Sequence, residues 1–286
     1  MDQSLVGDWT TGWREFSIVA DSGALWLRCP AAPPGFEARL VDVAPGRVRI
    51  EGGPLHGAEI VVEEEGDFSL GGHRPLERLD RPAEAGPGWG MMAPAEELEP
   101  DEIETFQHLW TWLAHPSRAP EVDLGGCDLY RFVRWLDRNG LALFHGDERI
   151  DLDRLPPTDW PAASHGEPEA GEFVYATADA LCSMFLAIVD PESTGRSAIQ
   201  RVEHFRSLEG DEVDIYQFHY TGGESSTCLR PGGLYLLPRD RFRPLSIYPG
   251  GPISTEWVSL EPVTPLACLV TTPGDFPFTD RFVVSA

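Results

Sequence analysis

The segment Phe173-Val174-Tyr175-Ala176-Thr177-Ala178-Asp179 predicts a strand that leads directly into a helix. Its first five residues are aromatic, β-branched or small, which suits a strand, and Asp179 belongs to the residue types that cap helices. From Asp179 to Val189 the apolar residues recur at helical spacing. They are Ala180, Leu181, Met184, Phe185 and Ile188.

Further strands surround this strand and helix in the second half of the chain. They are predicted at Leu141–Phe144, Val213–Phe218, Gly233–Leu237, Glu256–Ser259 and Leu266–Val270. One helix among many strands is typical of an α+β domain. We therefore expect residues 141–286 to form an α+β domain.

The first 80 residues predict a different unit, built of short strands. Period-two alternation with Gly and Pro turns marks strands at 15–19, 24–28, 47–50 and 58–62. This pattern predicts a small antiparallel β barrel or sandwich over residues 1–80. Trp9, Trp13 and Trp26 are the expected interior aromatics.

The stretch between these two parts predicts a linker and then helices. Residues 81–100 are rich in Pro and Gly without periodicity, so we expect a linker. Residues 101–140 predict a helical connector. Its first helix starts near Pro100 and ends before Pro116, and its second runs from about Asp128 to Arg138.

The composition limits the classes of partner. The formal net charge is -25, from 47 acidic residues and 22 basic ones that are all Arg. Such a field disfavours nucleic acid and would attract a basic protein. No apolar run is long enough to span a membrane, and the first residues lack a secretory pattern, so we expect a cytoplasmic protein. The five scattered cysteines form no zinc-like spacing, and no metal is expected.

Three segments of the second half carry side chains that could do chemistry. They are Phe144-His145-Gly146, Val174-Tyr175-Ala176-Thr177 and Thr255-Glu256-Trp257-Val258-Ser259. The first supplies an imidazole, the second a phenol ring and the third a carboxylate. A carboxylate can stabilise a developing oxocarbenium ion, and an aromatic face can hold a pyridinium ring. These are the needs of cleaving the bond between nicotinamide and ribose in NAD.

In order and in flanking residues the three segments resemble the His-Tyr-Glu motifs of the ADP-ribosyltransferase fold, the class that includes diphtheria-toxin-like and poly-ADP-ribose-polymerase-like enzymes. The loop from Ile150 to Pro156 after the first segment and the Ala-rich helix after the second resemble that family too. The resemblance covers about residues 138–286. It implies a split β-sheet domain and an NAD-dependent ADP-ribosyltransferase, without a metal, that modifies a protein or nucleic-acid acceptor. Proteins of this family are often toxins or effectors.

The resemblance also implies a role for each matched residue. His145 would bind the adenosine ribose, and the backbone of Gly146 would hold the nicotinamide amide. Tyr175 would stack on the nicotinamide ring, with Thr177 as a further NAD-binding residue of that segment. Glu256 would bind the nicotinamide ribose and stabilise the cation. These side chains must converge in one pocket around a single dinucleotide, and their placement on different faces would end this interpretation.

One residue departs from the family pattern, and other functions remain open. Asp147 stands where the family usually has Ser or Thr, which puts the usual hydroxyl contact in doubt. NAD hydrolysis and RNA 2′-phosphotransfer are alternatives on the same fold, although the acidic charge disfavours the second. A non-catalytic, immunity-type protein that sequesters a basic partner is the alternative from another class.

Overall fold

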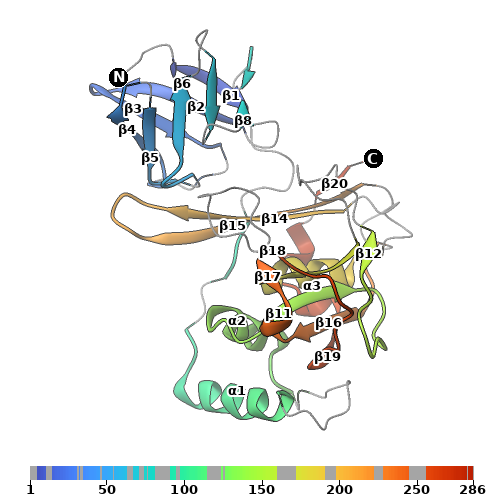
Figure 1. Cartoon of the computed structure of the whole chain (residues 1–286). Coiled ribbons are helices and arrows are strands. Elements are labelled where there is room, and N and C mark those ends of the chain that lie inside the picture. The colour runs from blue at the N-terminus through green and yellow to red at the C-terminus, as the bar shows by residue number, and fades with distance from the viewer. Residues whose placement is uncertain are drawn as a thin grey trace. The chain divides into compact units, whose positions relative to one another are not determined.

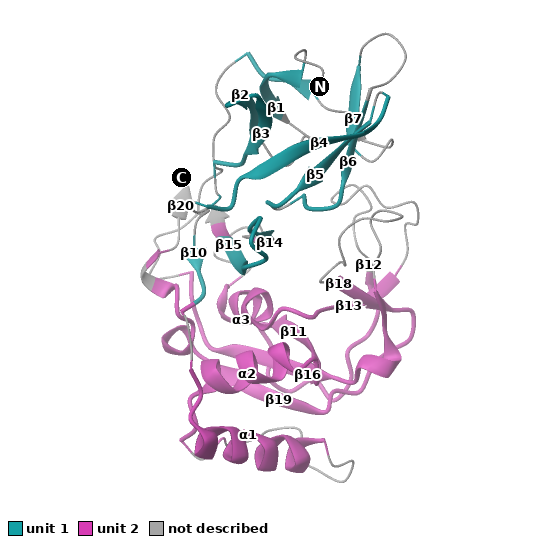
Figure 2. Cartoon of the chain, turned by 90° about the vertical axis from the view of Figure 1, so that its left-hand side faces the viewer, with its two compact units in different colours: residues 1–93, 202–217, 248–252 teal, residues 94–201, 218–247, 253–286 magenta. Residues whose placement is uncertain are grey.

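The structure is a computed structural model of the whole chain. It describes residues 5–10, 15–30, 32, 35–45, 47–53, 55–62, 67–70, 74–75, 77–80, 91–94, 97–114, 124, 126–159, 172–190, 198–221, 228–244, 256–281 and 283–285. The chain divides into two compact units, drawn in teal and magenta in Figure 2. The first contains residues 1–93 and 202–217, and the second contains most of the remainder. In the part of the chain that is described, no helix is long and apolar enough to cross a membrane.

The first unit contains a nearly closed antiparallel sheet (Figure 1). Its described strands follow the order β8-β7-β6-β5-β4-β3-β2-β1-β9. Only Leu76 separates β8 from β9 in the chain, so the two outermost strands of the sheet are consecutive in sequence. The strands are β1 (Gly7–Thr10), β2 (Glu15–Asp21), β3 (Ala24–Arg28), β4 (Ala38–Ala44), β5 (Arg47–Glu51), β6 (Glu59–Val62), β7 (Phe68–Leu70), β8 (Arg74–Pro75) and β9 (Glu77–Arg78).

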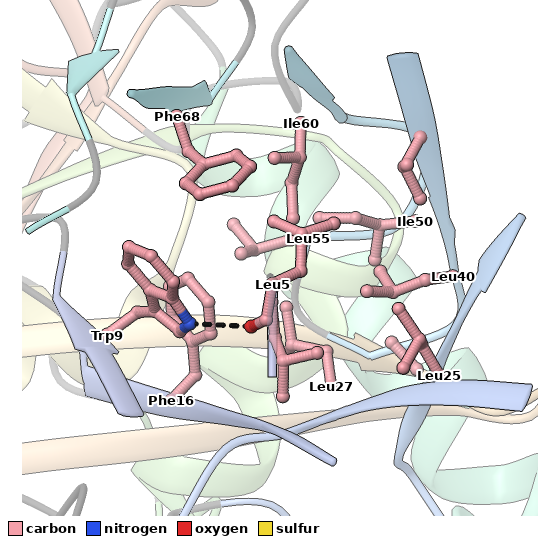
Figure 3. Packing of buried hydrophobic residues seen from close by; sticks show 13 residues of the cluster. Leu5, Trp9, Phe16, Leu25, Leu27, Leu40, Ile50, Leu55, Ile60 and Phe68 are labelled. Carbon is pink, nitrogen blue, oxygen red and sulfur yellow. Dashed lines mark hydrogen bonds between the residues drawn. The ribbon is translucent and has the colours of Figure 1, made fainter. Parts of the chain in front are cut away.

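One face of this sheet forms the core of the first unit, as Figure 3 shows. Trp9 is buried there, and its indole Nε1–H donates to the carbonyl of Leu5 at 2.8 Å. Leu25 and Leu27 are buried, whereas Trp26 between them is only half-buried. The expectation that Trp26 lies inside is therefore wrong, because alternation turns it to the other face. Trp13 lies outside the described residues.

The small antiparallel β unit predicted at the N-terminus is confirmed, as a nearly closed sheet. All four predicted strands are present, and strand β3 has the predicted bounds. The predicted linker segment contains β10 (Met91–Met92), and its residues 81–90 lie outside the described part.

Two helices open the second unit, and both predictions are confirmed. Helix α1 (Pro100–Leu113) begins at the proline, and helix α2 (Leu129–Arg138) is capped by Asp128, whose carboxylate accepts the backbone N–H of Arg131 at 3.1 Å. The guanidinium of Arg131 then donates to both carboxylate oxygens of Glu102, at 2.9 and 2.7 Å, which joins α2 to α1. Both helices belong to the same compact unit as the C-terminal sheet.

The main sheet of the second unit has the described order β17-β18-β13-β11-β16-β19, with β12 paired to β13. All pairs in it are antiparallel. Its elements are β11 (Leu143–Asp147), β12 (Thr158–Asp159), β13 (Glu172–Thr177), α3 (Ala180–Ile188), β16 (Gly232–Leu237), β17 (Arg243–Pro244), β18 (Glu256–Ser259) and β19 (Ala267–Thr271). The strands β14 (Ala198–Arg206), β15 (Glu212–Thr221) and β20 (Val283–Ser285) form another sheet with β10. This mixed architecture agrees with the predicted α+β class.

The core of the first unit generates a stability prediction. Leu40→Ala in β4 should lower the free energy of unfolding by about 3 kcal/mol, because the leucine is fully buried and its loss leaves a cavity. Val43→Ala in the same strand is the matched control and should cost about 0.5 kcal/mol or less, since Val43 is exposed. Chemical denaturation of the full chain measures both. Equal losses would contradict the assignment of the inner face.

Candidate active site

The sheet brings the three candidate segments together although they are far apart in sequence. His145 lies on β11, Tyr175 on β13 and Glu256 on β18, and these strands are neighbours in the order β18-β13-β11 (Figure 2). Thirty residues separate His145 from Tyr175, and 81 separate Tyr175 from Glu256. Thr177 is paired directly with Glu256. The sequence alone could not have fixed this order.

The pairing register divides the candidate side chains between the two faces of the sheet. Directly paired residues share a face, so Thr177 lies on the same face as Glu256, and Tyr175 lies two residues away on that face too. We call it the α3 face, because helix α3 packs against it. His145 is paired with Tyr235 and belongs to the opposite face, which we call the far face. This division counts against a pocket built on one face.

The sheet is, however, not continuous between His145 and Tyr175. Phe144 and Thr177 form the single backbone pair between β11 and β13 within their described residues. Beyond this pair, the Nδ1 atom of His145 lies 2.7 Å from the backbone carbonyl oxygen of Tyr175. The imidazole therefore bonds a carbonyl of β13 that a backbone N–H of the neighbouring strand would bond in a regular sheet. We call this place, where the two strands separate, the β11–β13 opening.

The bond to Tyr175 fixes the proton on the ring of His145. A carbonyl oxygen only accepts hydrogen bonds, so Nδ1 must carry the hydrogen. The other ring nitrogen, Nε2, lies 3.8 Å from Oδ2 of Asp147, on the same strand and face.

Gly146 lies on the α3 face and has a structural role of its own. A Cβ atom added there would come closer than 3.0 Å to the backbone of Ser183 and Ala187 in α3. Gly232 on the neighbouring strand β16 is in the same situation against Ala187. The absence of side chains at these two positions lets the helix backbone touch the strands. This contact explains Gly146 without any ligand.

Acidic groups gather around the start of α3. Asp179 caps the helix, since its Oδ1 accepts the backbone N–H of Cys182 at 2.8 Å. Burial raises the pKa of the Cys182 thiol, and the charge of Asp179 and its hydrogen bond raise it further. The charges of Glu256 and Asp137 add to the same effect. Glu256 is paired with Thr177, whose hydroxyl accepts the backbone N–H of Asp179. Oε2 of Glu256 is buried there.

One arginine offsets part of this negative charge. Arg134 of α2 is buried, and its Nη1 lies 2.5 Å from Oδ2 of Asp137 and 3.9 Å from Oδ2 of Asp179. Three carboxylates and one guanidinium therefore surround the start of α3. Such a site favours a cation and disfavours a phosphate at this helix end.

Asp147 is held as a carboxylate on the far face. Burial opposes its ionisation, but hydrogen bonds from Arg149 and His145 outweigh burial and hold its pKa well below the ordinary value. The Nε and Nη2 atoms of Arg149 each lie 2.9 Å from one carboxylate oxygen, in a fork, and the backbone N–H of Arg149 donates at 2.9 Å as well. Asp147, which stands where the resemblance leads us to expect Ser or Thr, is thus paired with Arg149.

Tyr235 positions the loop that follows Asp147, a role that no sequence pattern indicates. Its hydroxyl donates to the carbonyl of Arg149 at 2.8 Å and accepts the N–H of Leu152 at 3.1 Å. Burial raises the pKa of this phenol, so it stays a donor at neutral pH. The residue lies opposite His145, in a pairing that only the folded sheet defines.

The comparisons with known proteins give no relative. No protein-family model, no curated protein and no solved structure matches this chain. Among the described residues, no three His, Cys, Asp or Glu side chains are grouped to hold a metal ion. The functional argument therefore rests on the side chains and geometry of this chain.

The contact between Gly146 and α3 generates a second prediction. Gly146→Ala should destabilise the second unit by about 3 kcal/mol, because the added methyl group meets helix backbone that cannot move aside. Gly274→Ala is the control, since its Cβ would meet nothing closer than 3.6 Å. Thermal unfolding of both variants measures the difference. A Gly146→Ala protein as stable as the wild type would show that α3 does not pack here.

The environment of Asp147 generates a prediction on pH. Its pKa is lower in the folded protein than in the unfolded chain, so the ionised form stabilises the fold above about pH 4. As the pH falls below about 4, that contribution is lost. Asp147→Asn should therefore lower the melting temperature most near pH 7, with a smaller difference from wild type near pH 3. The exposed Asp153→Asn is the control, and a loss for Asp147→Asn that is independent of pH would refute the ionised pair.

Proposed function

We propose that the second unit of this chain is an ADP-ribosyltransferase that cleaves NAD at the bond between nicotinamide and ribose and transfers ADP-ribose to a macromolecular acceptor. The observation that carries the proposal is the adjacency of β11, β13 and β18 in one sheet. It brings the three distant segments that carry His145, Tyr175 and Glu256 onto neighbouring strands.

The charge around Glu256 suits the chemistry of this cleavage. Nicotinamide leaves as a neutral pyridine, so the reaction needs little acid catalysis, and positive charge develops on the ribose. The carboxylates of Glu256, Asp179 and Asp137 lie around the first turn of α3. Fixed negative groups in a partly buried site stabilise such a cation without reorganising. Glu256 is the group proposed to contact the ribose.

The half-buried Tyr175 supplies the aromatic surface. It lies on the α3 face two residues before Thr177, which is paired with Glu256. A ring at this distance along the strand can face the base while the carboxylate faces the sugar, and an aromatic face attracts a pyridinium ring. Thr177 is half-buried between them, and its hydroxyl accepts the N–H of Asp179 at 3.0 Å.

The separate faces of His145 and Tyr175 are compatible with one ligand only at the β11–β13 opening. In a continuous sheet, backbone hydrogen bonds would lie between the two side chains. Here the ladder stops after a single pair, and the imidazole itself bonds the carbonyl of Tyr175. A dinucleotide lying across this opening could contact His145 from one side and Tyr175 and Glu256 from the other.

Nicotinamide release from NAD by the purified full chain tests the proposal. Glu256→Gln keeps the size of the side chain and removes its charge, so we expect the rate to fall by about 100-fold or more. Glu261→Gln is the matched control, because Glu261 is an exposed acid just beyond β18 and should leave the rate unchanged. Turnover that is the same in Glu256→Gln as in wild type would contradict the proposal.

The same reaction mixture identifies the acceptor. Mass spectrometry of a cell lysate incubated with NAD and the protein should find ADP-ribose attached to a protein or nucleic acid, and Glu256→Gln should abolish the adduct. Free ADP-ribose as the single product would identify an NAD hydrolase instead. Absence of nicotinamide release with and without lysate would reject both enzymes and favour the non-catalytic binder.

A further inference from the structure

Three arginines lie close together at one edge of the C-terminal sheet. Arg239 and Arg241 begin and end a short 3-10 helix, and Arg243 is the first residue of the outermost strand β17. Asp240 is the one acid among them, and residues 241–255 contain no Asp or Glu. We call the three the arginine edge. Its local charge is positive, although the whole chain has 47 acidic residues against 22 basic ones.

The arginine edge is not neutralised by the described part of the chain. Arg131 and Arg149 bond carboxylates of Glu102 and Asp147, whereas no arginine of the edge forms an ion pair with a described residue. Two of its members, Arg241 and Arg243, are exposed. A guanidinium group without a carboxylate partner keeps its N–H donors available for an anionic ligand.

The arginine edge adjoins the strand that carries Glu256. Arg243 is paired with Val258, two residues after Glu256, so these three residues lie on the α3 face. Arg239 lies over the indole ring of Trp257, 4.6 Å from its centre. Because Trp257 stands between Glu256 and Val258 and belongs to the far face, positive charge is present on both faces of β18.

A strand of nucleic acid supplies the two kinds of group that this edge can bind. Its phosphates accept hydrogen bonds from guanidinium groups, and the fork geometry of arginine suits them. Its unpaired bases can stack on the plane of an arginine, and Trp257 supports Arg239 from the other side. An acidic peptide offers carboxylates for the first interaction but no base for the second. The chemistry therefore favours a single-stranded nucleic acid.

We propose that the arginine edge binds single-stranded nucleic acid through its phosphates, with a base stacked on Arg239. The net charge of -25 opposes a polyanion at long range, but charges beyond about 8 Å are largely screened at physiological ionic strength. The local arginines then decide the contact. The inference goes beyond the proposed function, since it uses no step of NAD cleavage. In an enzyme that cleaves NAD, the bound strand lies beside Glu256 as the acceptor.

Fluorescence anisotropy of a labelled oligothymidine of about 15 nucleotides, titrated with the full chain without NAD, tests this proposal. Replacement of Arg239, Arg241 and Arg243 together by Gln should weaken binding by about 10-fold or more. It should also reduce the slope of log K against log salt concentration by about 2, because three phosphate contacts are lost. Thermal unfolding shows whether this variant is folded. The variant with only the two exposed arginines replaced decides the question where it is not, with a slope reduced by about 1.4.

A charge-matched variant is the control. It removes three positive charges from exposed arginines of the first unit that each have an acidic partner, namely Arg28, Arg47 and Arg49, again by replacement with Gln. This variant has the same net charge as the first and should bind the oligonucleotide as the wild type does. Oligouridine of the same length shows whether RNA or DNA binds more tightly, and binding of either one that depends on the arginine edge supports the proposal.

Four results would overturn the inference. They are a wild type that binds neither oligonucleotide, equal losses in the control variant, displacement of the oligonucleotide by saturating NAD, and equally tight binding of an oligoglutamate of the same charge. Nicotinamide release is measured separately, so the two proposals can fail independently. Release of nicotinamide without binding of an oligonucleotide leaves only the proposed function standing. Binding that depends on the arginine edge, without release of nicotinamide, leaves only this inference standing.

Discussion

The close contact between helix α3 and two glycines is the constraint on which the candidate site depends. Gly146 and Gly232 lie on adjacent strands, and a side chain at either would collide with the helix backbone. Their absence lets α3 lie directly on the sheet. The start of α3 lies next to Glu256, because Thr177, the pairing partner of Glu256, accepts the backbone N–H of Asp179 at 3.0 Å. A helix held further from the sheet would leave these groups in water.

Hydrogen bonds and arginine partners explain why negative charge can gather in a partly buried place. Burial of a carboxylate is costly unless hydrogen bonds or opposite charge offset it. Asp179 is offset by the backbone N–H of Cys182, and Asp137 by Arg134. The far face repeats this arrangement, where Asp147 is offset by Arg149. Although the net charge of the chain is -25, these three buried or half-buried acids each have a specific partner that offsets the cost of burying their charge.

The two faces of the C-terminal sheet have different chemistry. The α3 face carries a ring and a carboxylate beside a cluster of acids. The far face carries an imidazole beside a paired acid, with Trp257 packed among its apolar residues and Arg239 above the indole ring, 4.6 Å from its centre. The ladder between β11 and β13 has a single backbone pair in the described residues, and beyond it the imidazole of His145 bonds the carbonyl of Tyr175. A function that uses all three candidate side chains needs this interruption.

Local pattern in the sequence determined the types of element with good accuracy. Helix α3 starts after Asp179 as the cap predicts, β18 has the predicted bounds Glu256–Ser259, and the small N-terminal sheet follows from alternation. These features depend on neighbours a few residues away, which the sequence displays directly. Strand β14 was not predicted, because charged residues at Arg201, Glu203 and Arg206 hide its pattern. Only the tertiary structure decided which strands are neighbours, that His145 lies on the far face, and that Asp147 is paired with Arg149. Such facts depend on long-range pairing and on where a ladder stops, and residues 30 or 81 positions apart leave no local trace of either.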